Sequence, residues 1–387
     1  MIATNGLTPL EIASHILVGR EDSDPLRAPR GKRRAIVALE YALRPALRKP
    51  PCLVAFSGGR DSSALLAVAT RVARQDGLPE PIPVTLRFAE VPETDEEDWQ
   101  LLAVRQLGLT EWLRPQFTDE LDLLGPVARA VMEEHGLPYP FNLHLLVPLM
   151  DPARGGSLVT GVGGDQALYP AGRMLDVLAR RTRPVPRDLL RVAVGVAPPF
   201  VRRRALRSRV TLSYPWLTPK GNSMLSRAWL EHEADQPFRW DGVLREMWRS
   251  HFMQLSIRHI SAVGAHLGVD VHHPFVDATF ISALAHEAGA TGFASRTAAM
   301  SALFGDALPP ELIGRATKAS FNDVLWNRHT RAFVGGLDET RLDRALASLG
   351  VESIVDSRKL AAHWSTPGPM ANSFLLLQAC WLALREG

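Results

Sequence analysis

One continuous stretch, Cys52 to Ser63, constrains the fold of this chain more than any other. A short apolar strand, Leu53 to Phe56, leads into Ser57-Gly58-Gly59-Arg60-Asp61-Ser62-Ser63, and the apolar residues that follow recur at helical spacing. The two glycines allow a tight turn, so the loop amides and the helix N-terminus can point at one spot. Such a spot binds anions, and Asp61 adds a carboxylate suited to Mg²⁺.

A second glycine-rich loop is predicted to lie beside the first. The strand Ser157 to Thr160 ends in Gly161-Val162-Gly163-Gly164-Asp165. Alone, this pattern fits an ordinary turn before a helix equally well. Ligands of parallel sheets bind at the carboxyl ends of the strands, so two such loops would converge on one triphosphate. Asp61 and Asp165 could then hold one Mg²⁺ that shields a pyrophosphate leaving group.

The hydrophobic pattern predicts an α/β fold. It indicates a helix over residues 33–48, strands at Leu53–Phe56, Pro83–Phe88 and Ser157–Thr160, and almost only helices beyond residue 175. We therefore expect a parallel sheet with a large helical C-terminal part packed on it. Residues 1–32 are expected to be a loosely structured lead-in. One domain is expected over 33–387, with an α/β nucleotide-binding part at 33–175 and a mainly helical part at 176–387.

Composition and charge exclude several protein classes. With 46% hydrophobic and 22% charged residues, no long apolar run and no signal peptide, the chain is expected to be a cytoplasmic protein without membrane contact. Cys52 and Cys380 lack metal-ligand spacing and are expected to be reduced core residues. The segment 180–209 is rich in arginine, with Asp188 as its only acid. It predicts either a solvated helical face or a surface for an acidic peptide, a partner protein or nucleic acid.

Two later stretches carry further candidate residues. His272 and His273 stand together in Val269–Asp277, but adjacent histidines seldom ligate one ion, which favours a polar loop under the site. Lys318 follows a proline-capped short helix in Leu308–Phe321. It is either a solvated lysine or a cation that stabilises charge at an α-phosphate.

In this order, the four stretches resemble the synthetase domain of the asparagine synthetase family, which includes β-lactam synthetases and lasso peptide macrolactam cyclases. The family pattern is SGGxDSS, a helix with a DE pair (here Asp95-Glu96), [ST]GxGxDE, ExRxPFLD and LPxxxxxRxxKxxF, and it extends from about residue 35 to the C-terminus. The first loop is that of the ATP pyrophosphatases, not a P-loop, because no Gly-Lys-Ser/Thr follows the glycines. The resemblance implies the ATP pyrophosphatase type of sheet, with ATP and Mg²⁺ as cofactors.

The resemblance also implies roles for individual residues. The first loop would grip the β- and γ-phosphates, residues at the strand ends would border the nucleotide, two aspartates would bind Mg²⁺, and two residues would be catalytic. The residues that would hold the phosphates are Ser57, Gly58, Gly59, Asp61, Ser62 and Ser63. Those that would border the nucleotide are Phe56, Leu86, Thr160, Gly161 and Gly163. The Mg²⁺ ligands would be Asp61 and Asp165, and the catalytic residues Lys318 and Asp270.

Departures from the family pattern argue for a substrate other than aspartate. Val162 stands where asparagine synthetases have Glu and β-lactam synthetases have Tyr, which leaves the general base open. Gln166 and Asp270 also replace family glutamates. The chain begins Met1-Ile2, without the N-terminal cysteine nucleophile of a glutaminase domain, so we expect no use of glutamine as nitrogen donor.

These observations predict an amide synthetase that adenylates a carboxylate, releases pyrophosphate and lets an amine attack. The substrates would be small molecules or a peptide, with a lasso-type macrolactam or another natural-product amide favoured and with the Arg-rich segment as a docking place for a precursor peptide or partner. One alternative is a tRNA-modifying ATP pyrophosphatase, although no basic, aromatic RNA-binding domain is recognisable and nucleic acid is not expected. Another is a non-catalytic ATP-binding partner of another synthetase.

Overall fold

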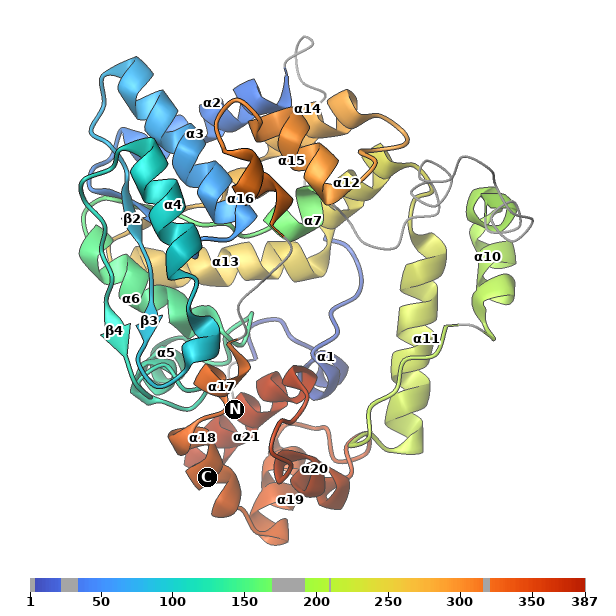
Figure 1. The fold of residues 1–387 in the computed structure, drawn as a ribbon. Coiled ribbons are helices and arrows are strands. Elements are labelled where there is room, and N and C mark those ends of the chain that lie inside the picture. Colours follow the sequence, from blue (N-terminus) through green and yellow to red (C-terminus); the bar gives the residue numbers. More distant parts are fainter. Residues whose placement is uncertain (1–3, 22–33, 169–191, 209, 316–320, 387) are drawn as a thin grey trace.

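A parallel sheet forms the centre of the molecule (Figure 1). The computed structural model describes residues 4–21, 34–168, 192–208, 210–315 and 321–386. The four strands have the order β2-β1-β5-β6, and every neighbouring pair is parallel. Their bounds are β1 Cys52–Ala55, β2 Ile82–Val84, β5 Ser157–Val159 and β6 Asp270–His272. The predicted α/β class with a parallel sheet is confirmed.

The two strands that carry the glycine-rich loops are neighbours. β1 pairs with β5, with Leu53 opposite Leu158 and Val54 opposite Val159. Parallel strands in this register end at the same edge of the sheet, so the loops that follow them leave side by side. The predicted convergence of the two loops therefore rests on direct strand pairing.

Helices cover both faces of this sheet. On one face, α2 (Ala35–Leu47), α3 (Arg60–Asp76) and α14 (Ala278–Ala288) share an apolar cluster that includes Leu39, Val68 and Phe280. On the other face, α6 (Val147–Met150) and α13 (His251–His266) pack against Leu53 and Leu158. In Figure 1, α13 runs across the middle of the molecule. Burial on both faces explains why β1 and β5 are almost wholly apolar.

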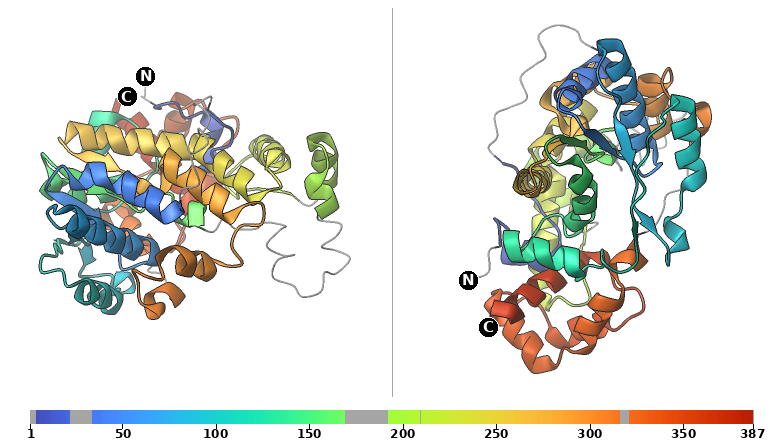
Figure 2. Two further views of the ribbon diagram at one scale, coloured as in Figure 1. Left: turned by 90° about the horizontal axis from the view of Figure 1, so that it is seen from above. Right: turned by 90° about the vertical axis from the view of Figure 1, so that its left-hand side faces the viewer.

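Two further groups of helices lie away from the sheet. α17 (Asn322–Leu325), α18 (Arg328–Gly335), α19 (Glu339–Ser348), α20 (Ser357–Trp364) and α21 (Phe374–Glu386) gather in the lower part of Figure 1. α10 (Pro199–Leu206) and α11 (Pro219–Asp235) lie together at one side of the molecule (Figures 1 and 2). The other elements are β3 Arg87–Phe88, α4 Glu97–Leu107, β4 Gln116–Phe117, α5 Pro126–His135, α7 Gly164–Leu168, α12 Trp240–Arg249, α15 Arg296–Phe304 and α16 Pro310–Gly314.

The described part of the lead-in is more ordered than the sequence predicted. Residues Pro9–Ser14 form α1, which begins at a capping box between Thr8 and Glu11. Ile12 and Ala13 are fully buried, and the backbone carbonyl of Ala13 accepts a hydrogen bond from the indole of Trp216 at 2.8 Å. α1 also contacts α21, so an N-terminal segment is built into the C-terminal helical group.

Two strand predictions also differ from the structure. The predicted strand Pro83–Phe88 divides, because β2 ends at Val84 and β3 pairs with β4 in a separate two-stranded sheet. Thr85 lies at the division, where its hydroxyl donates to the backbone carbonyl of Phe56 at 2.6 Å. β6 was missed in the region expected to be helical, because three residues of mixed polarity give no strand pattern.

Cys52 and Cys380 are free and buried, as predicted. Burial raises the pKa of the Cys52 thiol to about 11, so it stays protonated at neutral pH. Among the described residues, no helix is both long and apolar enough to cross a membrane.

Candidate active site

The loop between β1 and α3 is held in shape by its own serine hydroxyls. The amide of Gly59 donates to Ser57 Oγ at 3.2 Å, and Ser62 Oγ donates to the carbonyl of Gly59 at 3.1 Å. Gly58 has a φ of +82°, and a Cβ there would lie only 2.7 Å from the side chain of Gln100. This conformation therefore requires glycine, and the loop is held in place by contacts within the chain.

The second loop lies directly against the first. Gly163 has a φ of +85°, and a Cβ at this position would collide with Val276. A Cβ on Gly164 would lie 2.7 Å from Asp61 Oδ2. The backbone of the second loop thus touches the carboxylate of the first, an approach that only glycine allows.

Arg296, at the start of α15, lies between the two predicted metal ligands. Its guanidinium donates to Asp61 Oδ2 at 2.7 Å and forms a second ion pair with Asp165 Oδ1. The Asp61 side chain is 15% exposed, that of Arg296 24% and that of Asp165 46%. The structure therefore brings Asp61 and Asp165 together around one cationic group.

Burial and charge act on this cluster in opposite directions. Burial raises the pKa of Asp61 above its ordinary value, and Arg296 partly opposes that rise. Burial alone would lower the pKa of Arg296, but the two carboxylates outweigh it and the pKa is raised. Arg296 therefore stays protonated. The buried Asp61 carboxylate is costly to keep charged unless a cation lies beside it.

The donor set fits Mg²⁺. Asp61 Oδ1 is buried and has no hydrogen-bond partner among the described residues, so its lone pairs are available to a cation. Among the described residues, no cluster of three or more His, Cys, Asp or Glu side chains is placed to hold a metal ion by protein ligands alone. Mg²⁺ commonly takes one or two protein carboxylates and completes its octahedron with phosphates and water. Asp61 and Asp165 match that pattern.

Two buried residues that the sequence analysis gave no role support the first loop. Arg315 donates to the carbonyl of Gly58 at 2.6 Å and forms a buried ion pair with Glu96, the residue before α4. Its guanidinium also lies over the ring of Trp99, 5.2 Å from the centroid. Arg315 is the arginine of the LPxxxxxRxxKxxF stretch and Glu96 the glutamate of the DE pair, so the motifs signalled both positions. Arg296 lies in no quoted motif.

The residues expected to border the nucleotide lie at the strand ends. Phe56 follows β1 and is buried, and Thr160 follows β5 with its amide bound to the carbonyl of His272 at 2.9 Å. Leu86 is half-buried between β2 and β3, and a Cβ on Gly161 would meet only open space. Open space at Gly161, beside the loops, leaves room for a ligand there.

The two adjacent histidines take part in packing. Thr160 Oγ1 and His273 Nδ1 are 2.6 Å apart, and burial lowers the pKa of His273 to about 4. His273 is therefore neutral at physiological pH. This placement agrees with the interpretation of a polar loop under the site.

Of the two predicted catalytic residues, the structure describes Asp270, which lies apart from this cluster. Asp270 is the first residue of β6, opposite Ser157 at the start of β5, so it lies at the far edge of the sheet from both loops. Its carboxylate is exposed and accepts from Lys49 Nζ at 2.7 Å. Lys318 lies outside the described residues, three positions after Arg315.

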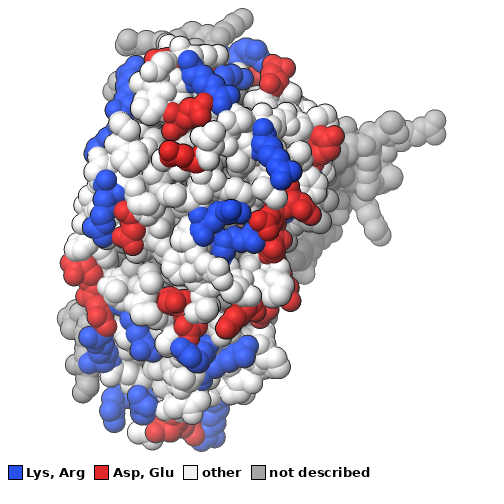
Figure 3. Space-filling view, turned by 60° about the vertical axis from the view of Figure 1, so that its left-hand side comes forward, with Lys and Arg blue, Asp and Glu red and all other residues white. Residues whose placement is uncertain are grey.

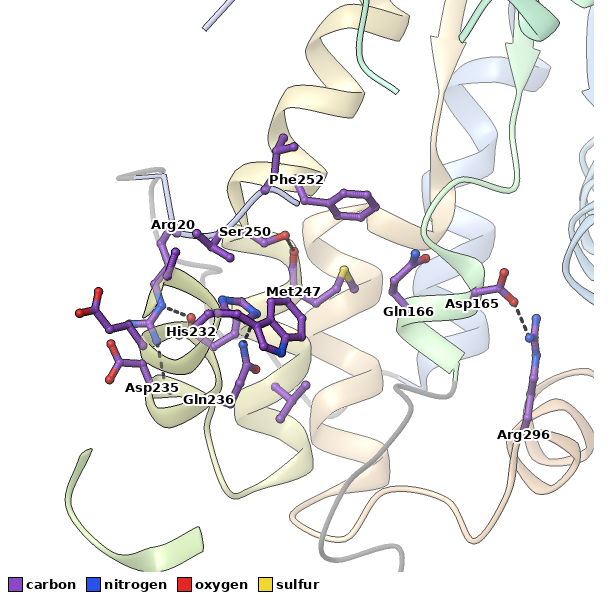
Figure 4. A pocket seen from close by; sticks show the side chains of 18 residues that line it. Arg20, Asp165, Gln166, His232, Asp235, Gln236, Met247, Ser250, Phe252 and Arg296 are labelled. Carbon is purple, nitrogen blue, oxygen red and sulfur yellow. Dashed lines mark hydrogen bonds and ion pairs between the residues drawn. The ribbon is translucent and has the colours of Figure 1, made fainter. Parts of the chain in front are cut away.

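A cavity of about 940 Å³ opens beside the aspartate cluster (Figure 4). Asp165, Gln166 and Arg296 line one end of it, and the rest of the wall comes from α11, α12, the start of α13 and residues 17–20. Val162, which replaces the family Glu or Tyr, packs against an apolar cluster under the sheet. The site therefore combines an ion-paired cluster of two aspartates and one arginine with a large adjoining space.

Comparison with known families decides what this arrangement belongs to. The model of the asparagine synthase family matches residues 38–381. The chain belongs to this family. A search of curated proteins found no match. Membership supports an ATP-dependent, amide-forming carbon–nitrogen ligase in general, and asparagine synthase-type domains generally bind ATP with Mg²⁺.

In this asparagine synthase family member, we expect Arg296→Met to make stability dependent on divalent metal. Without the guanidinium, Asp61 and Asp165 would lose the ion-pair partner that they share, at a cost of about 2 kcal/mol. The melting temperature should fall by several degrees without metal and recover in millimolar Mg²⁺. Thermal denaturation with and without Mg²⁺ measures this.

The matched control is Arg239→Met, which removes an exposed arginine paired with Asp241. Mg²⁺ should not stabilise this variant more than the unmodified chain. Equal stabilisation of both arginine variants by Mg²⁺ would contradict the role of Arg296 as an internal counter-cation.

Proposed function

We propose that this chain adenylates a substrate carboxylate and joins it to an amine. A carboxylate oxygen attacks the α-phosphorus of ATP, the bond between the α-phosphorus and the α–β bridging oxygen breaks, and pyrophosphate departs. The amine then attacks the acyl carbon, AMP leaves with the electron pair of the acyl–oxygen bond, and the amine gives up one proton. The product is an amide. Bound Mg²⁺ would supply neutralisation of the phosphate charges.

One observation carries this proposal: Asp61 and Asp165 converge on a single cationic group at the edge where β1 and β5 end. The preformed loop of Ser57–Ser63 would hold the β- and γ-phosphates on its amides and hydroxyls. Holding ATP by two rigid loops makes adenylation effectively unimolecular. We further propose that residues 33–387 act as one synthetase domain.

The substrates we favour are those of natural-product amide formation, including a lasso-type macrolactam. The size of the cavity beside Asp165 supports a substrate larger than aspartate. Part of the Arg-rich segment is described as α10, which presents Phe200 to solvent with an exposure of 72% beside Arg202–Arg204. We propose this surface as the docking place of a precursor peptide or partner protein.

Surface charge gives little support to the tRNA-modifying alternative. On the face drawn in Figure 3, acidic and basic side chains of the described residues are interspersed over the surface. Proteins that track a phosphate backbone gather lysine and arginine into a patch or stripe. The family match likewise favours amide formation over RNA chemistry.

Product analysis tests the proposed function. The purified chain is incubated with ATP, Mg²⁺ and a panel of carboxylic acids and amines, and the nucleotides are separated by anion exchange. We expect AMP and pyrophosphate in equal amounts. A predominance of ADP and phosphate would refute the adenylation step, and the absence of any ATP cleavage would favour the non-catalytic partner.

A further inference from the structure

We propose that the cavity beside Asp165 binds the body of the substrate to be adenylated, and that this substrate is a carboxylic acid with a bulky apolar or aromatic body. This inference rests on the proposed function and names its substrate class.

The cavity is continuous with the reaction centre at one end. Asp165 and Arg296 belong both to its lining and to the ion-paired cluster with Asp61. In Figure 4 these residues stand at one side of the space, with the α11 side chains His232 and Asp235 at the other. A molecule bound in the cavity can therefore present one end to the nucleotide.

The volume suits a large substrate. Pockets of about 300–1,000 Å³ take drug-sized ligands, and at about 940 Å³ this cavity lies near the top of that range. Aspartate would leave most of the space to water. A small substrate would therefore be poorly positioned for attack on the α-phosphorus.

The middle of the cavity is apolar. Trp229 on α11, Met247 on α12 and Phe252 on α13 line it, together with Val243 and Leu17. The ring of Trp229 lies 5.3 Å from that of His232, which is hydrogen-bonded to Gln236 at 2.9 Å. Large apolar and aromatic walls with a few polar groups are the usual lining of a site for an amphipathic organic molecule.

Three of the four acidic residues that line the cavity have basic partners, and the fourth, Glu231, is exposed to solvent. Glu246 is paired with Arg20, Asp235 lies 3.3 Å from Arg203, and Asp165 is paired with Arg296. The ammonium and the second carboxylate of an amino acid such as aspartate would each need a partner in this wall or pay a desolvation cost. An uncharged, apolar body avoids that cost.

The charge at the inner end selects a carboxylate over an amine. Arg296 is the cationic side chain that faces both the cavity and the reaction centre. With Mg²⁺ neutralising Asp61 and Asp165, the guanidinium of Arg296 would attract a carboxylate that approaches this end and would repel an ammonium. The occupant we assign is therefore the acid that is adenylated, and its apolar body extends toward Trp229.

Equilibrium binding of three probes tests this assignment. They are 4-phenylbutyrate, 4-phenylbutylamine and aspartate, titrated into the full chain with Mg²⁺ and an ATP analogue that has a methylene group between the α- and β-phosphates. We expect 4-phenylbutyrate to bind at least about tenfold more tightly than either other probe. Tighter binding of aspartate would overturn the apolar class, and tighter binding of the amine would overturn the carboxylate assignment.

Two variants with opposite effects on volume locate the site. Trp229→Ala removes part of the apolar wall, and Ala228→Phe fills space in the cavity from the same helix. Each variant should bind 4-phenylbutyrate about tenfold more weakly. The control, Trp381→Ala, removes a half-buried tryptophan on α21 whose ring faces Arg129 and Arg385, away from the cavity. Unchanged binding in both cavity variants, with melting temperatures near that of the unmodified chain, would place the ligand elsewhere.

The assay separates this inference from the proposed function. If the chain binds 4-phenylbutyrate but forms ADP, the cavity remains the binding site for the acid and the adenylation step is refuted. If the chain forms AMP with aspartate but not with an apolar acid, the adenylation step stands and the proposed substrate class is refuted.

Discussion

Asp61→Asn and Asp165→Asn are each expected to lower ATP-dependent adenylation by roughly a thousandfold while the protein stays folded. A metal ion that neutralises phosphate charge contributes several kcal/mol to the transition state, and each 1.4 kcal/mol is about a factor of ten in rate. Asp61 is the more buried ligand, and its Oδ1 has no hydrogen-bond partner among the described residues, so Asp61→Asn should be the more damaging change. Pyrophosphate release at saturating Mg²⁺ measures both.

Asp76→Asn is the matched control for the Asp61 variant. Asp76 is the last residue of α3, the helix that begins beside Asp61, and its carboxylate forms a surface ion pair with Arg44. Such pairs contribute little, so activity should stay near that of the unmodified chain. Near-normal activity of either Asp61→Asn or Asp165→Asn would mean that the two loops do not share a metal.

Lys318→Ala is expected to lower kcat by about a hundredfold to a thousandfold, with little change in the affinity for ATP. Negative charge builds on the α-phosphate oxygens and on the departing pyrophosphate, and a preorganised ammonium stabilises that charge by roughly 3–4 kcal/mol. Two residues near Lys318 in the sequence are anchored: Arg315 binds the carbonyl of Gly58, and Phe321 packs edge-on against Phe88 with centroids 6.0 Å apart.

Two further variants separate a catalytic lysine from a solvated one. Lys318→Arg should restore little activity, because a planar guanidinium does not replace a compact point charge. Lys359→Ala, which removes a surface lysine paired with Asp356 on α20, should leave kcat unchanged. Steady-state kinetics with ATP decides the matter, and an unaltered kcat in Lys318→Ala would remove the role proposed for this residue.

Local sequence was sufficient where the structure depends on near neighbours. The strand, the loop Ser57–Ser63 and the following helix were predicted because apolar runs, glycines and a helical period follow one another directly. The second loop was predicted for the same reason. Their position at the same edge of the sheet followed from a general property of parallel sheets, because ligands bind at the carboxyl ends of the strands. That the two strands are neighbours is a finding of the structure.

Elements that are very short, or whose packing partners lie far along the chain, could not be predicted from the local sequence. β6 has three residues, and only its pairing with β5 makes it a strand. That pairing also sets Asp270 at the opposite edge of the sheet from Asp61, which position in a motif alone could not show. α1 is a helix of six residues, and its burial depends on Trp216 and α21, which follow much later in the chain.

The sequence by itself determined the chemistry of the two loops: which carboxylates are available, where the backbone can bend, and that a helix N-terminus follows the first loop. Only the tertiary structure decided what surrounds them. Arg296 is 235 residues from Asp61 along the chain, yet their side chains are in contact. The cavity wall likewise combines residues 17–20 with α11 and α12. The physical reason is that glycine conformations and helix caps act between near neighbours, whereas ion pairs and cavity walls depend on how distant segments pack.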